Sequence, residues 1–149
     1  MRENFNISQW IREVKGEKTE MNILVASLEK YGASVESDKD SRDVAALHYR
    51  IIFSFPENTV VTMGIILMDH QTNSDVVIET MTILPKHRKR MGFGSKAIAK
   101  VLRWAADNGL RDVRATQVAG QDNENFWKKN GFIQQKKPNP CNDFIYHIT

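Results

Sequence analysis

Two short stretches near the start of the chain carry apolar residues at helical spacing. Positions i, i+3, i+4 and i+7 fall on one face of a helix, so each stretch predicts a short amphipathic helix. The apolar positions are Ile7, Trp10, Ile11 and Val14 in the first stretch and Met21, Leu24, Leu28 and Tyr31 in the second. Gly32 follows the second stretch and is suited to end a helix. The polar residues from Ser34 to Asp43 predict a loop that at most begins as a short strand.

The period then changes to that of β-strands. Three runs, Val44 to Phe55, Thr59 to Met68 and Asp75 to Leu84, are rich in Val, Ile, Thr and aromatic residues. Turn-forming residues at 56–58 and 69–74 separate them. Because short connections favour antiparallel neighbours, we expect a three-stranded meander whose strands are largely buried.

The strongest helical pattern follows the third strand. Its apolar face carries Ile98, Val101, Leu102 and Ala105, and Asn108-Gly109 ends it. Beyond it we expect a strand over Val113–Val118, a helix capped by Asp122 or Asn123 and running to Lys129, and strands over Ile133–Lys137 and Phe144–Ile148. The strands that flank a strand-helix-strand crossover are parallel. The predicted fold is therefore α/β (α+β): a mixed, mostly antiparallel sheet with a central β-α-β crossover and flanking helices.

Composition places few further limits on this picture. A chain of 149 residues, 41% of them hydrophobic, can bury a core of its own, so we expect a single domain over 1–149. The single cysteine, Cys141, excludes an internal disulfide and a thiolate zinc site, and no histidine has a partner at ligand spacing, so we expect no metal. No apolar run reaches the roughly 18 residues that span a bilayer, and the N-terminus has no signal-peptide pattern. We expect a cytoplasmic protein without membrane contact.

The connection between the third strand and the strong helix carries the most specific chemistry. Lys86-His87-Arg88-Lys89-Arg90 places four fixed positive charges within five residues, and Gly92 and Gly94 follow. Glycines let the backbone turn tightly and approach a ligand closely. A helix that begins near Phe93 directs its unpaired amides and the positive end of its dipole at this loop, which predicts an anion site with phosphate as the usual occupant. A dinucleotide fingerprint is excluded because Ala97 replaces its third glycine, and the Walker spacing is absent.

The segment Lys89-Arg90-Met91-Gly92-Phe93-Gly94 resembles the pyrophosphate-binding motif of the GCN5-related N-acetyltransferases (GNAT), Arg/Gln-x-x-Gly-x-Gly/Ala. Lys89 stands where that family prefers Arg or Gln. A second match is the aromatic pair Phe126-Trp127 followed by Gly131-Phe132. The resemblance covers roughly residues 43–149, which it identifies as an acetyl-CoA-binding core. Residues 1–40 correspond more loosely to a helical part on the acceptor side.

The resemblance implies a set of cofactor-binding residues. The strand end at Thr82, Ile83 and Leu84 is expected to offer backbone groups to the pantetheine and the acetyl carbonyl of acetyl-CoA. Backbone amides are expected to hold the pyrophosphate, over Lys89, Arg90, Met91, Gly92, Phe93, Gly94 and Ser95. Asn123 is expected to hydrogen-bond the pantetheine arm. The aromatic pair is expected first of all to pack the core, and Trp127 also to contact the cofactor.

Trp127 departs from the family pattern. Many members carry a tyrosine there, which protonates the departing thiolate, whereas an indole only donates hydrogen bonds and cannot act as a general acid. Either solvent protonates the thiolate, or another hydroxyl does, or the chain has lost activity.

Acetyl transfer requires a neutral amine, so a base near the acceptor is expected. Glu79 is the candidate catalytic residue because it interrupts an apolar strand, and a carboxylate buried there is costly unless it is partnered or used. Counted along an even strand, Glu79 and Ile83 lie on the same face. Desolvation would then raise the pKa of Glu79 toward a useful range.

Three functions follow from this reading. The first is an acetyl-CoA-dependent N-acetyltransferase acting on a primary amine of a small molecule or a protein. The second is a catalytically inactive domain that binds CoA or a protein partner. The third, a nucleic-acid-binding module, is disfavoured because the positive charge is confined to one short loop. A homodimer is compatible with the resemblance, and the acceptor is not identified by the sequence.

Overall fold

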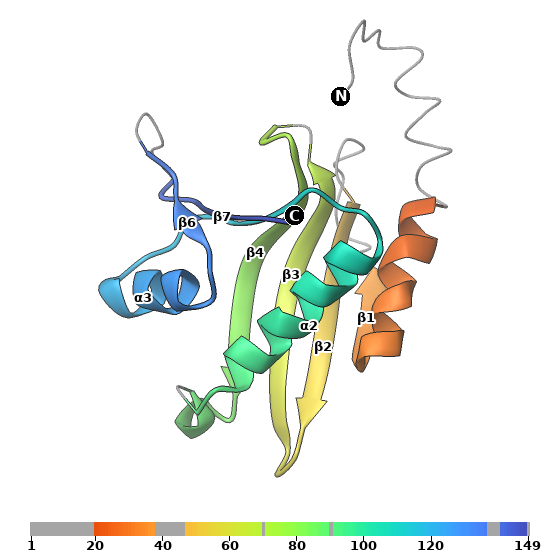
Figure 1. Cartoon of the computed structure of the whole chain (residues 1–149). Coiled ribbons are helices and arrows are strands. Elements are labelled where there is room, and N and C mark those ends of the chain that lie inside the picture. Colours follow the sequence, from red (N-terminus) through yellow and green to blue (C-terminus); the bar gives the residue numbers. More distant parts are fainter. Residues whose placement is uncertain (1–19, 38–46, 70, 90, 137–140, 149) are drawn as a thin grey trace, which may run out of the picture.

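A seven-stranded sheet organises the molecule (Figure 1). The computed structural model describes residues 20–37, 47–69, 71–89, 91–136 and 141–148. The helix expected at 7–14, strand residues 44–46 and 137, and Arg90 lie outside these residues. The strands are β1 (Ala33–Ser37), β2 (Leu47–Phe55), β3 (Thr59–Asp69), β4 (Ser74–Leu84), β5 (Asp112–Ala115), β6 (Ile133–Gln134) and β7 (Phe144–His147). They lie in the order β1-β2-β3-β4-β5-β7-β6, and every neighbouring pair is antiparallel except β4 and β5.

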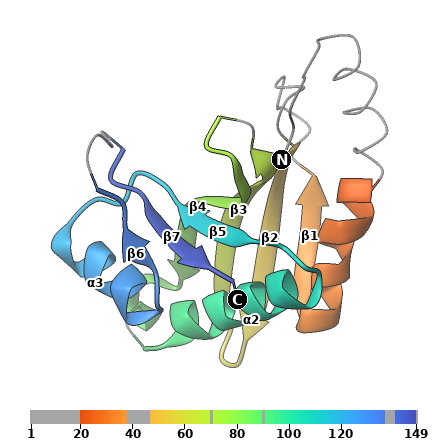
Figure 2. The same ribbon diagram turned by 45° about the horizontal axis from the view of Figure 1, so that its top comes forward.

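This topology confirms the predicted fold class. The meander is β2–β3–β4, the crossover runs from β4 through α2 (Phe93–Asp107) to the parallel β5, and β6 pairs with β7 (Figure 2). Several boundaries differ from the prediction by one residue, and three differences are larger: β1 is a full strand paired with β2, β5 ends at Ala115 instead of Val118, and β6 ends at Gln134. The N-cap of α3 (Gln121–Lys129) is Gly120 instead of Asp122 or Asn123.

Helix α2 packs the sheet with the apolar face that its periodicity predicts. Ala97, Ile98, Val101, Trp104 and Ala105 are all fully buried. The helix ends at Asn108, whose side-chain amide donates to the carbonyl of Trp104 at 2.8 Å. These residues form one core cluster together with inward-facing residues of β2 to β5.

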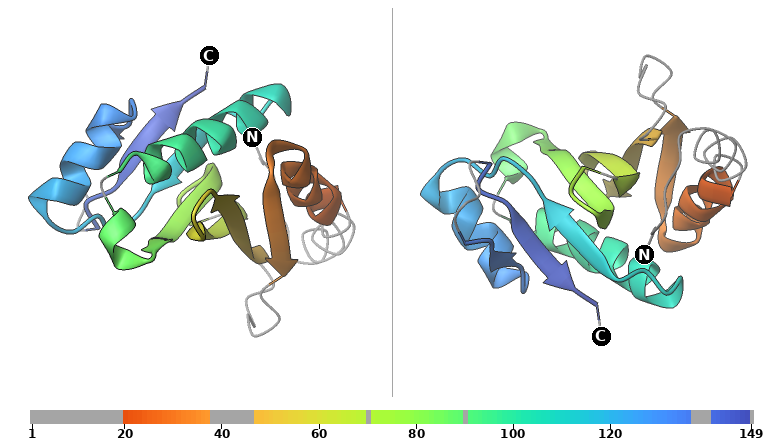
Figure 3. Two further views of the ribbon diagram at one scale, coloured as in Figure 1. Left: turned by 90° about the horizontal axis from the view of Figure 1, so that it is seen from below. Right: turned by 90° about the horizontal axis from the view of Figure 1, so that it is seen from above.

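The second predicted helix lies beside α2. Residues 20–26 are α-helical and continue as the 3-10 helix η1 (Ser27–Tyr31). Trp104 Nε1 donates to Ser27 Oγ at 2.9 Å, and Lys100 Nζ donates to the carbonyl of Tyr31 at 3.0 Å. The helical segment 20–31 and α2 therefore cover the same face of β1 to β4, whereas α3 lies at the other end of α2 (Figures 1 and 3). None of the helices described is long and apolar enough to cross a membrane.

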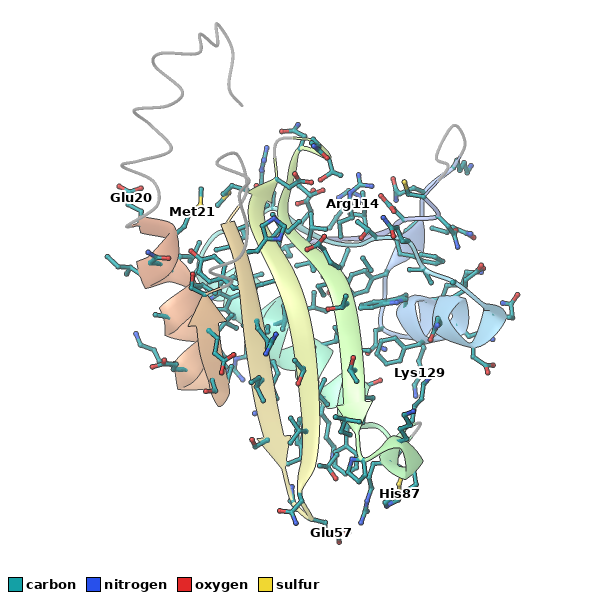
Figure 4. All side chains as sticks on the ribbon, turned by 180° about the vertical axis from the view of Figure 1, so that it is seen from behind. Glu20, Met21, Glu57, His87, Arg114 and Lys129 are labelled. Atoms are coloured by element: carbon teal, nitrogen blue, oxygen red, sulfur yellow. The ribbon has the colours of Figure 1, made fainter. Side chains whose placement is uncertain are left out.

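The opposite face of β2 to β4 is not covered by any described helix (Figure 4). We call it the open face. Along β2 the buried Tyr49, Ile51 and Phe53 point into the core cluster, so the residues that alternate with them, among them His48 and Arg50, belong to the open face.

Strand β4 is buried in its first half only, which corrects the expectation of a largely buried strand. Ser74 to Ile78 are buried, whereas Glu79 to Leu84 are exposed or half-buried. The change coincides with a β-bulge: Gly64 pairs with Thr80 but Ile65 pairs with Ile78, so Glu79 is the extra residue. Gly64 N donates to Thr80 Oγ1 at 3.0 Å across this point.

Candidate functional site

A cleft of about 460 Å³ opens where β4 and β5 separate. Their last paired residues are Ile78 and Ala115, and Thr116 N still donates to the carbonyl of Ile78 at 3.2 Å. β4 then continues for six residues toward η2 (Lys86–Arg88), while the chain after β5 turns away into α3. The cleft is lined by Ile78, Glu79, Thr80, Met81, Ile83, Lys89, Gly92, Gly94, Ser95, Ala115, Thr116, Gln117, Val118, Ala119, Asp122, Asn123, Asn125, Phe126, Trp127 and Lys129.

One wall of the cleft is an unpaired strand edge. Beyond Ile78, no strand of the described chain pairs with the side of β4 that faces β5. The backbone N–H and C=O groups that point away from β3 between Glu79 and Ile83 are therefore available to an extended ligand that carries amide groups.

The start of α2 forms one end of the cleft. The first helical hydrogen bond runs from Lys96 N to the carbonyl of Gly92, so the amides of Phe93, Gly94 and Ser95 have no acceptor within the helix. Gly92 is the N-cap, with φ 88°, a conformation that L side chains rarely adopt. No side chain caps this end. The three amides and the positive end of the helix dipole form an anion site.

Gly94 allows the start of α2 to pack closely against both walls. A Cβ at this position would lie 3.1 Å from Phe126 Cε1 on α3 and 3.2 Å from Ile83 Cδ1 on β4. Asn130, the C-cap of α3, donates from its amide to Ser95 Oγ at 3.2 Å. The end of α3 is thus fixed next to the beginning of α2.

The basic loop divides into two parts. Arg88 forms an ion pair with Glu57 in the β2–β3 turn and does not line the cleft. Lys89 lines it. Lys129, at the end of α3 (Figure 4), lines it as well. Two cations therefore lie along the part of the cleft formed by the start of α2 and the end of α3.

Helix α3 supplies the wall opposite β4. Trp127 is 7% exposed and packs edge-on against Phe126, with ring centroids 5.1 Å apart, and against Phe132 at 4.8 Å. It both packs the core and lines the cleft. Asn123 lines the cleft as well, and its side chain donates to the carbonyl of Ala119 at 2.7 Å, which leaves its carbonyl oxygen available to accept a hydrogen bond.

The structure brings together eight of the residues predicted from sequence: Glu79, Ile83, Lys89, Gly92, Gly94, Ser95, Asn123 and Trp127. Thr82, Leu84, Met91 and Phe93 do not line the cleft. Leu84 and Met91 are 48% and 57% exposed, and the Phe93 ring packs against Phe55 with centroids 5.4 Å apart.

Glu79 corrects two expectations. Its side chain is 43% exposed, so it is not a buried carboxylate. Its Oε1 atom lies 3.2 Å from Nδ1 of His48, which belongs to the open face, whereas Ile83 packs against the core cluster. The expected shared face is wrong because the bulge at Glu79 shifts the alternation of side chains by one position.

Sequence reasoning missed the loop between β5 and α3. Residues 116–119 line the cleft without forming any motif. Two residues that precede β7 hold the loop in place: Asn142 Nδ2 donates to the carbonyl of Val118 at 2.7 Å, and Asp143 Oδ1 accepts from Gln117 N at 3.2 Å. The positive φ of 55° at Gln117 shows that this loop is shaped by its surroundings.

The profile of the Acetyltransferase (GNAT) family matches residues 21–132. No curated protein sequence gives a significant match.

Several solved structures give matches at low identity. AtaTR bound with AcCoA is 14% identical, with a TM-score of 0.49 over 78% of this chain and 93% of that chain. A GNAT-family acetyltransferase from Staphylococcus aureus Mu50 is 14% identical, with a TM-score of 0.49 over 70% of this chain and 69% of that chain. The KacTA–DNA complex is 15% identical, with a TM-score of 0.49 over 77% of this chain and 92% of that chain.

Proposed function

The chain belongs to the GNAT acetyltransferase family, and we propose that it transfers an acetyl group from acetyl-CoA to a primary amine. The observation that carries this proposal is the cleft between β4 and β5, which combines an unpaired strand edge with an anion site at the start of α2. Acetyl-CoA has a matching shape: an extended pantetheine arm with two amides, followed by a pyrophosphate.

The residues present fit this cosubstrate. The amides of Phe93, Gly94 and Ser95 suit the pyrophosphate, and Lys89 and Lys129 add positive charge. Gly94 keeps the helix start free of a side chain where a Cβ would make tight contacts with Phe126 and Ile83. The carbonyl oxygen of Asn123 suits an amide N–H of the pantetheine arm.

When bound, acetyl-CoA supplies an acetyl group activated as a thioester. The edge of β4 orients the arm and directs a backbone N–H toward the acetyl carbonyl, where negative charge develops during attack. Trp127 and Phe126 form an apolar wall that excludes water from this region. Glu79, at the bulge, stands where the cleft meets the open face and is our candidate to prepare the amine.

A second candidate function is an inactive domain that binds CoA. It is favoured by Trp127, a buried side chain with no acid-base function at the position where many family members carry tyrosine. In the active protein, solvent would protonate the departing thiolate.

The acceptor is a small molecule or a protein with a primary amine. Our proposal retains the division of the domain into an acceptor-side part at 1–40 and an acetyl-CoA-binding core at 43–149, a cytoplasmic location, and a homodimer as the candidate assembly.

Turnover tests the proposal directly. The protein is incubated with acetyl-CoA and spermidine, kanamycin or a lysine-containing peptide, and released thiol is followed with a chromogenic disulfide. A reaction without amine corrects for the exposed Cys141, which also reacts with that reagent. We expect amine-dependent release that Gly92→Glu/Gly94→Glu abolishes. Binding of acetyl-CoA without turnover on any acceptor would favour the inactive domain, and neither binding nor turnover would refute both.

A further inference from the structure

We propose that His48 is the base that receives the proton of the acceptor amine, with Glu79 as the carboxylate that orients and stabilises its ring. This inference rests on the proposed acetyl transfer and deepens it. It assigns the role of general base to an imidazole on β2, His48, instead of to Glu79 on β4, the carboxylate that the strand pattern indicates. The pair arises only in the folded chain, because β2 and β4 are separated by β3.

The bulge makes this pair possible. His48 is paired with Ile66, and Ile66 with Val77, whereas Glu79 is the residue displaced by the register shift opposite Gly64 and Ile65. A regular strand would turn the Glu79 side chain toward the core-facing side with Ile83. The displaced residue instead reaches across β3 to His48 Nδ1, at 3.2 Å from its Oε1 atom.

Gly64 keeps the bulge in its present form. A Cβ at this position would lie 2.7 Å from Thr80 Oγ1, the atom that accepts the hydrogen bond from Gly64 N. Rotating Thr80 away would relieve the contact but break that bond. The glycine inside this strand is thus explained by the close approach of Thr80, the residue that follows Glu79 in the bulge.

The division of roles follows from ordinary acid-base chemistry. A general base works best when its pKa lies near the operating pH, and the usual pKa of imidazole, about 6.5, is much closer to neutrality than the value of about 4.3 for a glutamate. A carboxylate that accepts a hydrogen bond from Nδ1–H fixes the tautomer in which Nε2 carries the free lone pair. The side chain of His48 is 21% exposed, against 43% for Glu79, so the imidazole is the more enclosed of the two.

The position of the pair links the cleft to the open face. Glu79 lines the cleft, and His48 lies on the open face beside it. Among the described residues, the other charged groups of this face on β1 and β2 are Glu36 and Arg50, which pair with each other at 3.6 Å. The acceptor amine therefore approaches from the open face, while the cosubstrate occupies the cleft.

The proton balance of the step is simple. An N–H proton of the acceptor ammonium passes to His48 Nε2, and the freed lone pair forms the N–C bond with the acetyl carbonyl carbon. The nitrogen of the tetrahedral intermediate loses its second surplus proton to water, the C–S bond breaks, and the thiolate leaves and takes a proton from water. The imidazolium, stabilised by the Glu79 carboxylate, returns its proton to solvent.

Kinetics with three variants test the inference. His48→Gln is expected to lower kcat/KM by about 10²-fold or more, the usual contribution of a general base, while the dissociation constant for acetyl-CoA stays that of the unmodified protein. Glu79→Gln is expected to have a smaller effect, since the base remains. Arg50→Gln is the matched control because it changes a charged residue of the same strand and face, and it should retain normal turnover.

The pH profile separates a catalytic imidazole from a structural one. In the unmodified protein the rate should fall on acidification as His48 becomes protonated, and Glu79→Gln should shift this fall to lower pH because the carboxylate that stabilises the imidazolium is gone. His48→Gln should lose this acid limb, which a merely structural role would leave in place.

Two further outcomes are decisive. Amine acetylation by His48→Gln at the unmodified rate and with the unmodified pH profile would overturn the inference but leave the proposed function intact. Failure of the unmodified protein to acetylate any amine would remove both. A nuclear magnetic resonance titration of the His48 ring supplies a reading that needs no acceptor: its pKa should be lower in Glu79→Gln than in the unmodified protein, and an unchanged pKa would refute the pair.

Discussion

At the scale of single residues, three glycines shape the backbone around the cleft: Gly92 and Gly94 at the start of α2, and Gly64 opposite the bulge in β4. Gly92 and Gly94 could be found from sequence because they follow a basic loop and precede a strong amphipathic helix. Gly64 lies within a strand pattern, where a glycine is a known sign of a bulge. This bulge explains why the face predicted for Glu79 is wrong: counting by twos along β4 holds only when the strand is regular.

Trp127 carries a residue-scale prediction. Its indole lies in the cleft wall and cannot donate a proton to a thiolate, whereas a phenol can. Trp127→Tyr should therefore raise kcat while leaving the affinity for acetyl-CoA similar, as measured by initial rates of thiol release. Trp127→Phe provides the control, since it changes the packing in the same way without adding a hydroxyl, and it should not raise kcat. Equal rates for the two variants would show that thiolate protonation does not limit turnover.

At the scale of elements, the cleft depends on how the β5–α3 loop is held. Asp143 is buried and accepts from Arg114 Nη1 at 2.6 Å as well as from Gln117 N. No local pattern could reveal this, because the loop at 116–119 and the residues that precede β7 are more than twenty positions apart. Periodicity predicts the helices and strands, but it cannot show that the side chains just before β7 shape a wall of the site.

Asp143→Asn tests this arrangement. The amide can still accept one hydrogen bond, but it leaves the guanidinium of Arg114, only 15% exposed, without its charged partner. Breaking a buried ion pair in this way costs up to about 3–5 kcal/mol, so we expect a lower melting temperature. We also expect weaker binding of acetyl-CoA, because Gln117 lines the cleft.

The control for Asp143→Asn is Glu36→Gln, which removes an exposed ion pair worth at most about 1 kcal/mol and should change neither property measurably. If Asp143→Asn binds acetyl-CoA normally once its lower stability is allowed for, the loop is not part of the binding site.

At the scale of the whole molecule, the cleft exists because the two halves of the sheet are joined only at the start of β4. Asp75, the second residue of β4, has a side chain that is only 9% exposed. Its carboxylate accepts hydrogen bonds from Arg111 N at 2.7 Å and from Arg111 Nη2 at 2.8 Å. These bonds fix the loop after α2 against β4 just before the parallel pairing with β5 begins. The fold class and the crossover were predictable from pattern alone, but this anchoring contact was not.

The pH dependence of stability reports on this contact. Burial raises the pKa of Asp75, but the hydrogen bonds and charge of Arg111 outweigh it and hold that pKa below its usual value. Because the pKa of Asp75 is lowered by folding, ionised Asp75 stabilises the folded protein. This contribution to the unfolding free energy is complete at pH values above the unfolded-state pKa of about 3.9, and it is lost as the pH falls through the folded-state pKa. Asp75→Asn should therefore cost about 1–3 kcal/mol of unfolding free energy near neutral pH and progressively less in acid. Urea unfolding of both proteins across this range measures the difference, and a difference that does not depend on pH would contradict the account.

Binding of acetyl-CoA to the cleft is the central claim, and one calorimetric titration tests it most directly. The unmodified protein, Lys89→Glu and Lys86→Glu are each titrated with acetyl-CoA. The two variants make the same charge change three residues apart, on exposed side chains, but only Lys89 lines the cleft. We predict that the unmodified protein and Lys86→Glu bind with similar affinity, and that Lys89→Glu binds at least about tenfold more weakly, since 1.4 kcal/mol of lost charge interaction corresponds to that factor. Equal losses in the two variants would indicate a general effect of charge, and no binding to the unmodified protein would contradict the assignment of the cleft.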